Sequence, residues 1–455
     1  MVALLGFLKT VFWGLITLSV LVFIHEGGHY LAARTCGVRV TEFFLGLPCR
    51  FNIHHVSRRN GTKFGITPLL LGGYAAICGM DPTDVPCAPA VLAGVHRKGT
   101  ATVDELAESL SLSSEEVQDA CALLSEWGSI APVYDESKGE RPNSGYYPSC
   151  YSSVARDASG LTILDGRAFD RDHASVAGDP WTGFAKAREF FESERSRTYC
   201  GKTFLPRAFM LVAGILVNIA CGFLLLMCVY SLIGVNVSVD SNVIGSVDSG
   251  SIAAKLGIEA GDAIVSVGGE KTATWTDLVS ELDNHKDGNE FELVYRHGGR
   301  EKSGSVALGK DDHLGIAAST QTVRVSPLRS LKLSWDYIAL TAKGVASLLI
   351  PQQAKQVLDN STSIVGISVM SSEAADAGIA SYLSFAALIS LSLGFMNLLP
   401  IPPLDGGKLL IEVIQLVLHR ELSLKVQNVV SLIGIGLFGL LFVYMLRADI
   451  IRFIL

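Results

Sequence analysis

Five residues near the N-terminus, His-Glu-Gly-Gly-His, have the spacing of a metal-binding helix. His25 and His29 are four positions apart, so in a helix both imidazoles lie on one face and can bind one zinc ion. Glu26 follows the first histidine and is placed beside the metal as a base. The motif ends an apolar stretch. Ionisable side chains are costly in lipid, so this position favours a functional site over polar residues satisfied within a core.

A second polar segment offers the third protein ligand that a catalytic zinc site needs. Residues 397–407 end another apolar stretch, with three prolines before the sequence Leu-Asp-Gly-Gly. Irregular backbone at membrane depth is tolerated only inside protein or along a cavity. Asp405 can supply an oxygen ligand there, and the two glycines after it allow a close approach of the backbone. The alternative is an ordinary turn in which Asp405 caps a helix.

The elements that must position these residues are membrane-spanning helices. The chain has 455 residues, 49% of them hydrophobic and 18% charged, with a mean hydropathy of +0.38, which is too apolar for an ordinary soluble protein. A helix that crosses the hydrocarbon core needs about 20 apolar residues. We therefore expect a polytopic α-helical membrane protein with four spans, at 4–24, 208–235, 378–399 and 427–446. The first lacks a cleavage signal and is interpreted as a retained span.

Charges and cysteines predict how the spans are oriented. Basic residues gather after the first span and before the second, and by the positive-inside rule this makes the loop between them cytoplasmic. Seven of the nine cysteines lie in that loop and none follows the second span, as expected if the loop faces the reducing cytosol. We therefore expect a multi-pass plasma-membrane protein with its active site toward the cytoplasm and the segment after the second span outside.

The predicted cytoplasmic loop contains two kinds of unit. Short alternating stretches in 36–80 predict strands that lie against the membrane. A proline-rich linker follows at 81–90. Residues 100–131 have helical spacing, with Asp104 and Ser113 or Ser114 as N-caps, and 134–151 has the pattern of a broken hairpin.

Two helices and a hairpin resemble a winged helix, but this unit is rich in carboxylates and poor in Lys and Arg. Phosphate binding needs cations, so we expect the acidic insert to bind protein and no nucleic acid.

The segment after the second span predicts a separate domain. Short β-rich stretches at 263–267, 291–295 and 302–308 alternate with a helical stretch at 275–285, which is typical of a compact α+β domain. Residues 328–350 predict a further helix that suits a membrane surface better than a span.

Taken together, these motifs resemble the site-2 protease family of intramembrane zinc metalloproteases, in the bacterial branch that carries an extracytoplasmic PDZ domain. The resemblance covers most of the chain outside 81–180. It implies that His25, His29 and Asp405 bind Zn²⁺ and that Glu26 is the general base. It also gives Asn397 the position of an asparagine that helps to hold the substrate.

Further segments share the resemblance. Residues 213–218, which end in Asn218, are similar to a second-span motif of the family, and Gly72, Gly73 and Tyr74 resemble a strand edge that presents the substrate in extended form. Asn218 is expected near that edge, where it helps to bind the substrate. Residues 247–254 are similar to the family's PDZ pattern. The chain departs from the family at Ile215, where a proline is usual, and has glycine at both variable positions of the zinc motif. Each interior glycine costs a helix about 1 kcal/mol relative to alanine.

These expectations define the organisation and the activity. The predicted parts are a first span with membrane-associated strands at 1–80, an inserted winged-helix-like module with linkers at 81–180 and a second span at 181–236. A PDZ domain follows at 237–320, then an interfacial helix with a linker at 321–377 and two final spans at 378–455. The expected reaction is zinc-dependent hydrolysis of peptide bonds in transmembrane proteins, such as anti-sigma factors or remnant signal peptides.

Two other functions compete with this one. A catalytically inactive scaffold would gather protein partners through the PDZ and acidic modules. A zinc transporter would need polar sites along a path, whereas the polar residues here cluster at one level.

Overall fold

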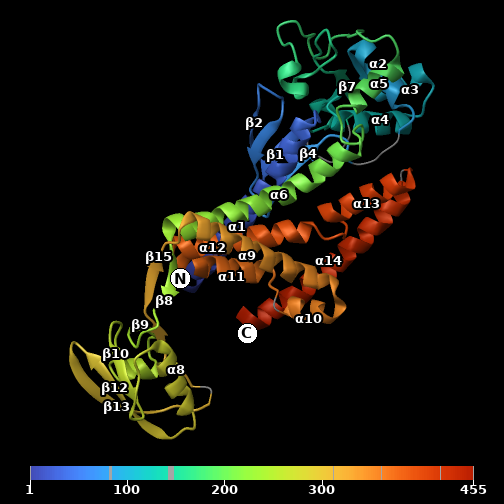
Figure 1. The fold of residues 1–455 in the computed structure, drawn as a ribbon. Coiled ribbons are helices and arrows are strands. Elements are labelled where there is room, and N and C mark those ends of the chain that lie inside the picture. The colour runs from blue at the N-terminus through green and yellow to red at the C-terminus, as the bar shows by residue number, and fades with distance from the viewer. Residues whose placement is uncertain are drawn as a thin grey trace. The chain divides into compact units, whose positions relative to one another are not determined.

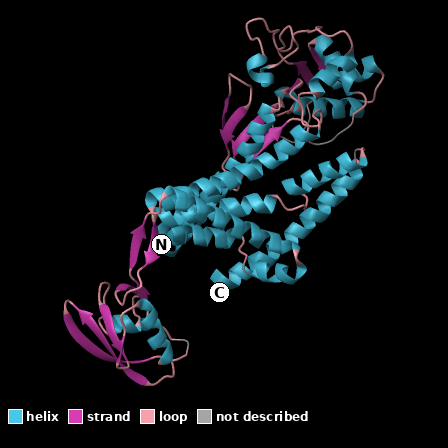
Figure 2. Ribbon diagram, in the orientation of Figure 1, coloured by secondary structure: helices cyan, strands magenta, loops and turns pink. Residues whose placement is uncertain are grey.

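The computed structural model describes residues 2–80, 85–141, 148–310, 312–359, 361–420 and 422–453. The chain forms two compact units (Figure 1). The first contains residues 1–226 and 334–455, and the second contains residues 227–333. Figure 2 shows that helices dominate the first unit, whereas strands make up much of the second.

Among the described residues, four helices are long and apolar enough to cross a membrane, as predicted. They are α1 (Val2–Thr35), α6 (Phe204–Cys228, extended by a π-helical turn over Val229–Ile233), α12 (Ile379–Asn397) and α14 (Leu424–Phe453). Large apolar side chains on α14 are exposed in the protein, including Leu432 at 69% and Leu440 at 72%. Such a surface is typical of a helix that contacts lipid or another protein.

The predicted membrane-associated strands form one four-stranded sheet. Its strands are β1 (Val40–Leu45), β2 (Ile53–Val56), β3 (Lys63–Ile66) and β4 (Gly73–Ile77). The order is β2-β3-β1-β4, with β1 parallel to β3 and antiparallel to β4. β4 is therefore an edge strand. It packs on α1, because a Cβ at Gly73 would lie 3.3 Å from Cα of Phe23.

Three helices that the hydropathy pattern did not reveal complete the first unit: α10 (Pro351–Asp359), α11 (Ile364–Asp376) and α13 (Asp405–Leu418). α11 packs along α1, where Thr17 Oγ1 lies 2.8 Å from Ser371 Oγ. Asp449 of α14 accepts hydrogen bonds from the backbone of Ser363 and Gly366 and so caps the start of α11. The helix predicted at 328–350 is present as α9 (Pro327–Ala346), followed by a short 3-10 turn over Ser347–Leu349.

The acidic insert is a small α+β module. Its elements are α2 (Ala88–Lys98), β5 (Thr100–Thr102), α3 (Val103–Leu110), α4 (Ser114–Glu126), β6 (Ile130–Val133) and β7 (Cys150–Ser153), with 3-10 turns at Glu136–Lys138 and Ile163–Ala168 and a following helix α5 (Ala187–Arg195). The sheet order is β5-β7-β6. Leu92, Leu106, Leu124 and Tyr151 lie in its core.

The structure corrects three details of the insert. Thr102, and not Asp104, caps α3, because its hydroxyl accepts from the backbone N–H of Glu105; Ser113 caps α4 as predicted. β5 precedes the predicted helices. The predicted linker is shorter than 81–90, because α2 begins at Ala88 with a proline in its first turn, a position that tolerates proline. Residues 81–84 and 142–147 of the predicted linker and hairpin lie outside the described residues.

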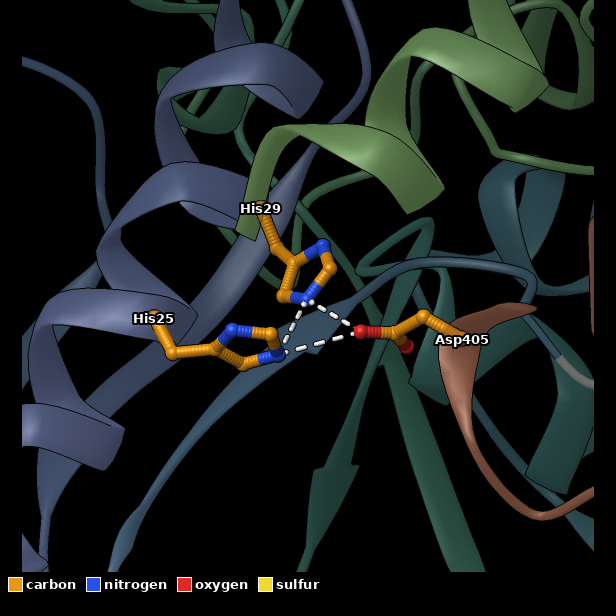
Figure 3. Close-up of side chains that lie close together, drawn as sticks. All are labelled: His25, His29 and Asp405. Carbon is orange, nitrogen blue, oxygen red and sulfur yellow. Dashed lines mark hydrogen bonds and ion pairs between the residues drawn. The ribbon is translucent and has the colours of Figure 1, made fainter. Parts of the chain in front are cut away.

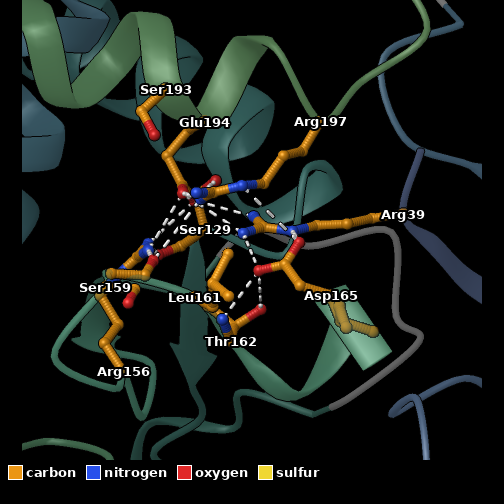
Figure 4. A network of polar contacts seen from close by, with 12 residues as sticks. Arg39, Ser129, Arg156, Ser159, Leu161, Thr162, Asp165, Ser193, Glu194 and Arg197 are labelled. Atoms are coloured by element: carbon orange, nitrogen blue, oxygen red, sulfur yellow. Dashed lines mark hydrogen bonds and ion pairs between the residues drawn. The ribbon is translucent and has the colours of Figure 1, made fainter. Parts of the chain in front are cut away.

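A buried charge network joins the insert to the membrane-associated sheet (Figure 4). Arg39, which precedes β1, is 1% exposed and donates to Asp165 and to Glu194 of α5 at 2.7 Å each. Arg156 donates to the same glutamate at 2.9 Å. Removing one partner of a buried ion pair costs about 3–5 kcal/mol because it leaves an uncompensated charge. The insert is therefore held firmly against the element that precedes β1.

The second unit is the predicted compact α+β domain. Its strands are β8 (Val235–Ser238), β9 (Ile244–Val247), β10 (Ala263–Val267), β11 (Glu270–Lys271), β12 (Glu290–His297), β13 (Arg300–Ala307), β14 (Ile316–Ala318) and β15 (Thr320–Val323), and its helices are α7 (Ile252–Lys255) and α8 (Trp275–Asn284). The main sheet has the order β11-β10-β12-β13. Ile264, Leu278 and Leu293 are fully buried in its core.

Candidate metal centre

Three side chains from the two ends of the chain meet in the first unit (Figure 3). His25 and His29 lie one turn apart on α1, and Asp405 is the first residue of α13. Asp405 Oδ2 lies 3.0 Å from Nε2 of His25 and 3.1 Å from Nε2 of His29, and the two Nε2 atoms are 3.1 Å apart. The histidines are 5% and 8% exposed. This triangle of two nitrogens and one oxygen is a group that can hold a metal ion.

The chain between α12 and α13 turns tightly to bring Asp405 to the histidines. A Cβ at Gly406 would lie 2.2 Å from the carbonyl oxygen of Leu398, and one at Gly407 would lie 2.3 Å from the nitrogen of Pro402. Both glycines are therefore required by close backbone approach, as predicted. Leu404 occupies the N-cap position of α13, with no side-chain cap. The Asp405 carboxylate faces the histidines, so the alternative of a simple helix cap is wrong.

The spacing of these atoms fits zinc. Ligands bound at about 2.0–2.1 Å in a tetrahedron lie about 3.3 Å from one another. The three separations of 3.0 to 3.1 Å are close to that value. Two imidazoles and one carboxylate also form a donor set that catalytic zinc sites use. The residues present therefore fit a zinc ion with a further coordination position open.

Helix α6 packs closely against the two histidines of α1. A Cβ at Gly214 of α6 would lie 2.3 Å from Nε2 of His29, so only glycine leaves room for the rings. A Cβ at Gly28 would lie 2.6 Å from the carbonyl oxygen of Ala213. The glycine at position 28 thus permits α1 and α6 to cross closely, which offsets its low helix propensity. Gly27 has no such constraint, because its Cβ would meet only Phe43 Cζ, at 3.8 Å.

Glu26 lies beside the cluster with its carboxylate free of hydrogen bonds to the described residues. It is half-buried and interacts electrostatically with His25, His29, Asp405 and Lys408. A carboxylate in this position can exchange a proton with a molecule held at the cluster.

The other predicted site residues lie at different distances from the cluster. Asn218 of α6 is fully buried, with its Nδ2 3.3 Å from Nδ1 of His25. Gly72 and Gly73 lie against Val22 and Phe23, about one turn of α1 before His25. The hydroxyl of Tyr74 donates a hydrogen bond to the carboxylate of Glu42 at 2.8 Å.

Asn397 ends α12 and has no hydrogen bond to the cluster within the described ranges. The structure therefore brings Asn218 to the metal centre, and no contact of Asn397 with the centre is found among the described residues.

Two contacts at the site were not foreseen from the sequence. His29 Nδ1 lies 2.7 Å from the carbonyl oxygen of Met210, which fixes the orientation of that ring. Ser390 of α12 donates to the carbonyl oxygen of Asn218 at 2.8 Å. Any residue provides a backbone carbonyl, so residue type gave no signal for either acceptor.

The chain is similar to several known proteins. The profile described as peptidase family M50 matches residues 13–441. The zinc metalloprotease RasP of Geobacillus kaustophilus is 27% identical over 461 residues, which cover 98% of this chain and 99% of that protein. The regulator of sigma-W protease RasP of Bacillus subtilis is 26% identical over 472 residues, which cover 99% and 100%.

A solved PDZ domain of an SdrC-like protein from Listeria monocytogenes is 22% identical, with a TM-score of 0.16, and covers 18% of this chain and 93% of its own.

Proposed function

Because this chain belongs to peptidase family M50, we propose that its catalytic zinc ion is held by His25, His29 and Asp405. The chain is a multi-pass membrane zinc metalloprotease, and the reaction is peptide-bond hydrolysis. The observation that carries the ligand assignment is the meeting of three donor atoms, within 3.1 Å of one another, from helices 380 positions apart. Zinc bound there supplies Lewis-acid chemistry, which polarises the scissile carbonyl and lowers the pKa of a water molecule.

Glu26 is the general base of this reaction. Its carboxylate accepts a proton from the attacking water and returns that proton to the leaving nitrogen. The water oxygen forms a bond to the carbonyl carbon, and the carbon–nitrogen bond breaks without an acyl-enzyme. The freedom of Glu26 from hydrogen bonds to described residues supports this role.

Metal-dependent cleavage tests the proposal. The purified protein in detergent should cleave a single-span test substrate, lose that activity when a chelator removes the metal, and regain it when zinc is added. An inactive scaffold would bind the substrate without cutting it, and a transporter would move zinc without any cleavage. Cleavage that persists after complete removal of the metal would contradict the assignment.

The substrates are transmembrane proteins that present an unwound segment to the edge of β4. A transmembrane helix hides its peptide bonds, so it must unwind and find polar partners before cleavage. β4 pairs with β1 on one side, and no described strand pairs with its other edge. Gly72 and Gly73 pack close to the turn that carries His25. Strand addition at this edge would place the substrate backbone beside the zinc ligands. Asn397, at the end of α12, contributes a further contact to the substrate.

Anti-sigma factors and remnant signal peptides are the proposed physiological substrates. The name of the Bacillus subtilis relative, a regulator of sigma-W protease, supports the first class. Proteins that accumulate as membrane-bound stubs in a catalytic mutant would identify them.

The second unit is proposed to be an extracytoplasmic PDZ domain, with the metal centre toward the cytoplasm. The pattern at 247–254 supports the domain assignment, and the basic residues around the first loop support the orientation. A protein ligand of this domain would restrict which substrates reach the membrane site. α9 carries exposed Leu328, Trp335 and Leu340 together with Lys332, a composition suited to the membrane surface.

The insert is proposed to be a winged-helix module that binds protein. Its element order, α2-β5-α3-α4-β6-β7, with β7 between the other two strands, supports that fold. The helices that would face DNA expose carboxylates instead of cations: Asp104, Glu105, Glu108, Glu115, Glu116, Asp119 and Glu126. A salt-sensitive complex between the protein and duplex DNA would overturn this proposal.

A further inference from the structure

Asn218 is a buried polar side chain that touches one of the proposed zinc ligands. Its exposed fraction is 0%, and its Oδ1 has no hydrogen-bond partner among the described residues. An unpaired buried polar group costs about 1–3 kcal/mol. An apolar residue of similar size would avoid that cost, so the amide must contribute something other than packing.

The geometry of the metal cluster determines which hydrogen bond Nδ1 of His25 must make with Asn218. Nε2 of His25 faces Asp405 and His29. A neutral imidazole has one protonated and one unprotonated nitrogen. If Nε2 gives its lone pair to zinc, Nδ1 carries the proton and must donate it to an acceptor.

The neighbouring histidine shows how such a requirement is met. Nδ1 of His29 lies 2.7 Å from the carbonyl oxygen of Met210. A carbonyl oxygen only accepts, so Nδ1 of His29 is the donor and its Nε2 is free to bind metal. His25 has no carbonyl in the equivalent place among the described contacts. The atom group that faces its Nδ1, at 3.3 Å, is the amide of Asn218.

We propose that Asn218 is a positioning residue, which accepts a hydrogen bond from Nδ1 of His25 through Oδ1 and so holds that ring in the form that binds zinc. A half turn of the amide places Oδ1 where Nδ2 lies, because the two atoms have nearly the same size. The present orientation leaves Oδ1 without a partner among the described residues, so the proton on Nδ1 of His25 decides which amide atom faces the ring. This inference rests on the proposed zinc ligands.

The packing around Asn218 favours this role over direct substrate binding. Ser390 of α12 donates to its carbonyl oxygen at 2.8 Å. A Cβ at Gly394, one turn further along α12, would lie 3.4 Å from Cβ of Asn218. A substrate chain cannot touch a side chain with no exposed surface unless α6 and α12 separate. The full burial of Asn218 therefore favours a contact to His25 over the expected contact to the substrate.

Zinc affinity of the purified protein in detergent, measured by competition with a chelator, tests the proposal. Asn218→Leu keeps the approximate size and removes the acceptor, and its zinc affinity should fall about 10–100-fold, as is typical when an outer partner of a metal ligand is lost. Asn218→Asp keeps an acceptor oxygen toward Nδ1 and should restore the affinity to near that of the natural protein. Ser390→Ala, which removes the contact to the Asn218 backbone but leaves the Asn218 amide in place, is the matched control and should bind zinc normally.

Two results would overturn the proposal. Natural zinc affinity in Asn218→Leu, together with a raised KM, would make Asn218 a substrate-binding residue. Zinc binding by Asn218→Asp as weak as that of Asn218→Leu would exclude the acceptor role. If the leucine variant does not fold, Asn218→Ala compared with Asn218→Asp gives the same decision. A natural protein that binds no zinc at all would instead refute the proposed function itself.

Discussion

Gly28→Ala is expected to inactivate the protein even though alanine favours a helix over glycine by about 1 kcal/mol. The new Cβ would lie 2.6 Å from the carbonyl oxygen of Ala213 and 2.8 Å from Cα of Gly214. These are backbone atoms of α6, so no side-chain rotation relieves the clash. Non-bonded heavy atoms prefer about 3.5 Å or more, which requires α1 and α6 to separate by roughly 1 Å.

The size of the effect follows from that separation. Overpacking of this kind costs about 1–3 kcal/mol, which exceeds the gain in helix propensity. A displacement of about 1 Å near the reacting groups can lower the rate about 100-fold. Gly28→Ala should therefore cleave a single-span substrate about 100-fold more slowly, with a lower unfolding temperature in detergent.

Gly27→Ala is the matched control for this prediction. Its Cβ would meet only the far end of Phe43, at 3.8 Å, which is ordinary contact. This variant should unfold at an equal or higher temperature and keep its activity. Equal activity of Gly27→Ala and Gly28→Ala would show that the close crossing of α1 and α6 does not hold the zinc ligands in place.

Two further predictions concern the domains outside the membrane. Burial, with a contribution from Arg156, lowers the pKa of His96 to about 3. Burial raises the pKa of Glu194, but the guanidinium groups of Arg39 and Arg156 outweigh this effect and hold the pKa of Glu194 well below its usual range. Both pKa values are lower in the folded state than in the unfolded state, so the insert should be fully stable above about pH 6.5. As the pH falls below the unfolded pKa of each group, the free energy of unfolding should fall by up to about 1.4 kcal/mol per pH unit for that group. Proteolysis of the insert as a function of pH checks this, and cleavage that does not accelerate in acid would contradict it. Deletion of residues 240–320 should broaden substrate choice if the second unit is a filter, and loss of hydrolysis of an already shortened substrate would show that it is not.

Motifs with fixed chemistry were predictable from the sequence. The spacing of His25 and His29 placed both rings on one helix face, and the polar end of the third span pointed to Asp405, although 376 residues separate it from His29. The four spans were predictable because lipid demands long apolar helices. Three strands of the second unit, β10, β12 and β13, followed from their β-rich stretches, whereas the other strands of the unit were not predicted.

Tertiary contacts were not predictable in the same way. α11 contains the buried Ser371, whose hydroxyl contacts Thr17 and the carbonyl oxygen of Trp13 on α1. Such polar residues deprive α11 of the apolar signature of a span. Ser363 caps α11 locally, but Asp449, more than 80 positions away, accepts from further backbone groups at the start of the helix. No local pattern reveals that second contribution. In an isolated helix, glycine at position 28 costs about 1 kcal/mol relative to alanine. In the folded protein glycine is favoured there, because a Cβ would clash with the backbone of α6.

Zinc content and cleavage of Glu26→Gln, measured on the same purified sample, test the central assignment most directly. Glutamine keeps the size of the side chain but cannot take a proton from the attacking water, so hydrolysis should collapse. His25, His29 and Asp405 remain, so the variant should still bind about one zinc ion, whereas Asp405→Ala should lose both metal and activity. Full activity of Glu26→Gln, or unchanged zinc affinity of Asp405→Ala, would show that these residues do not have the roles assigned to them.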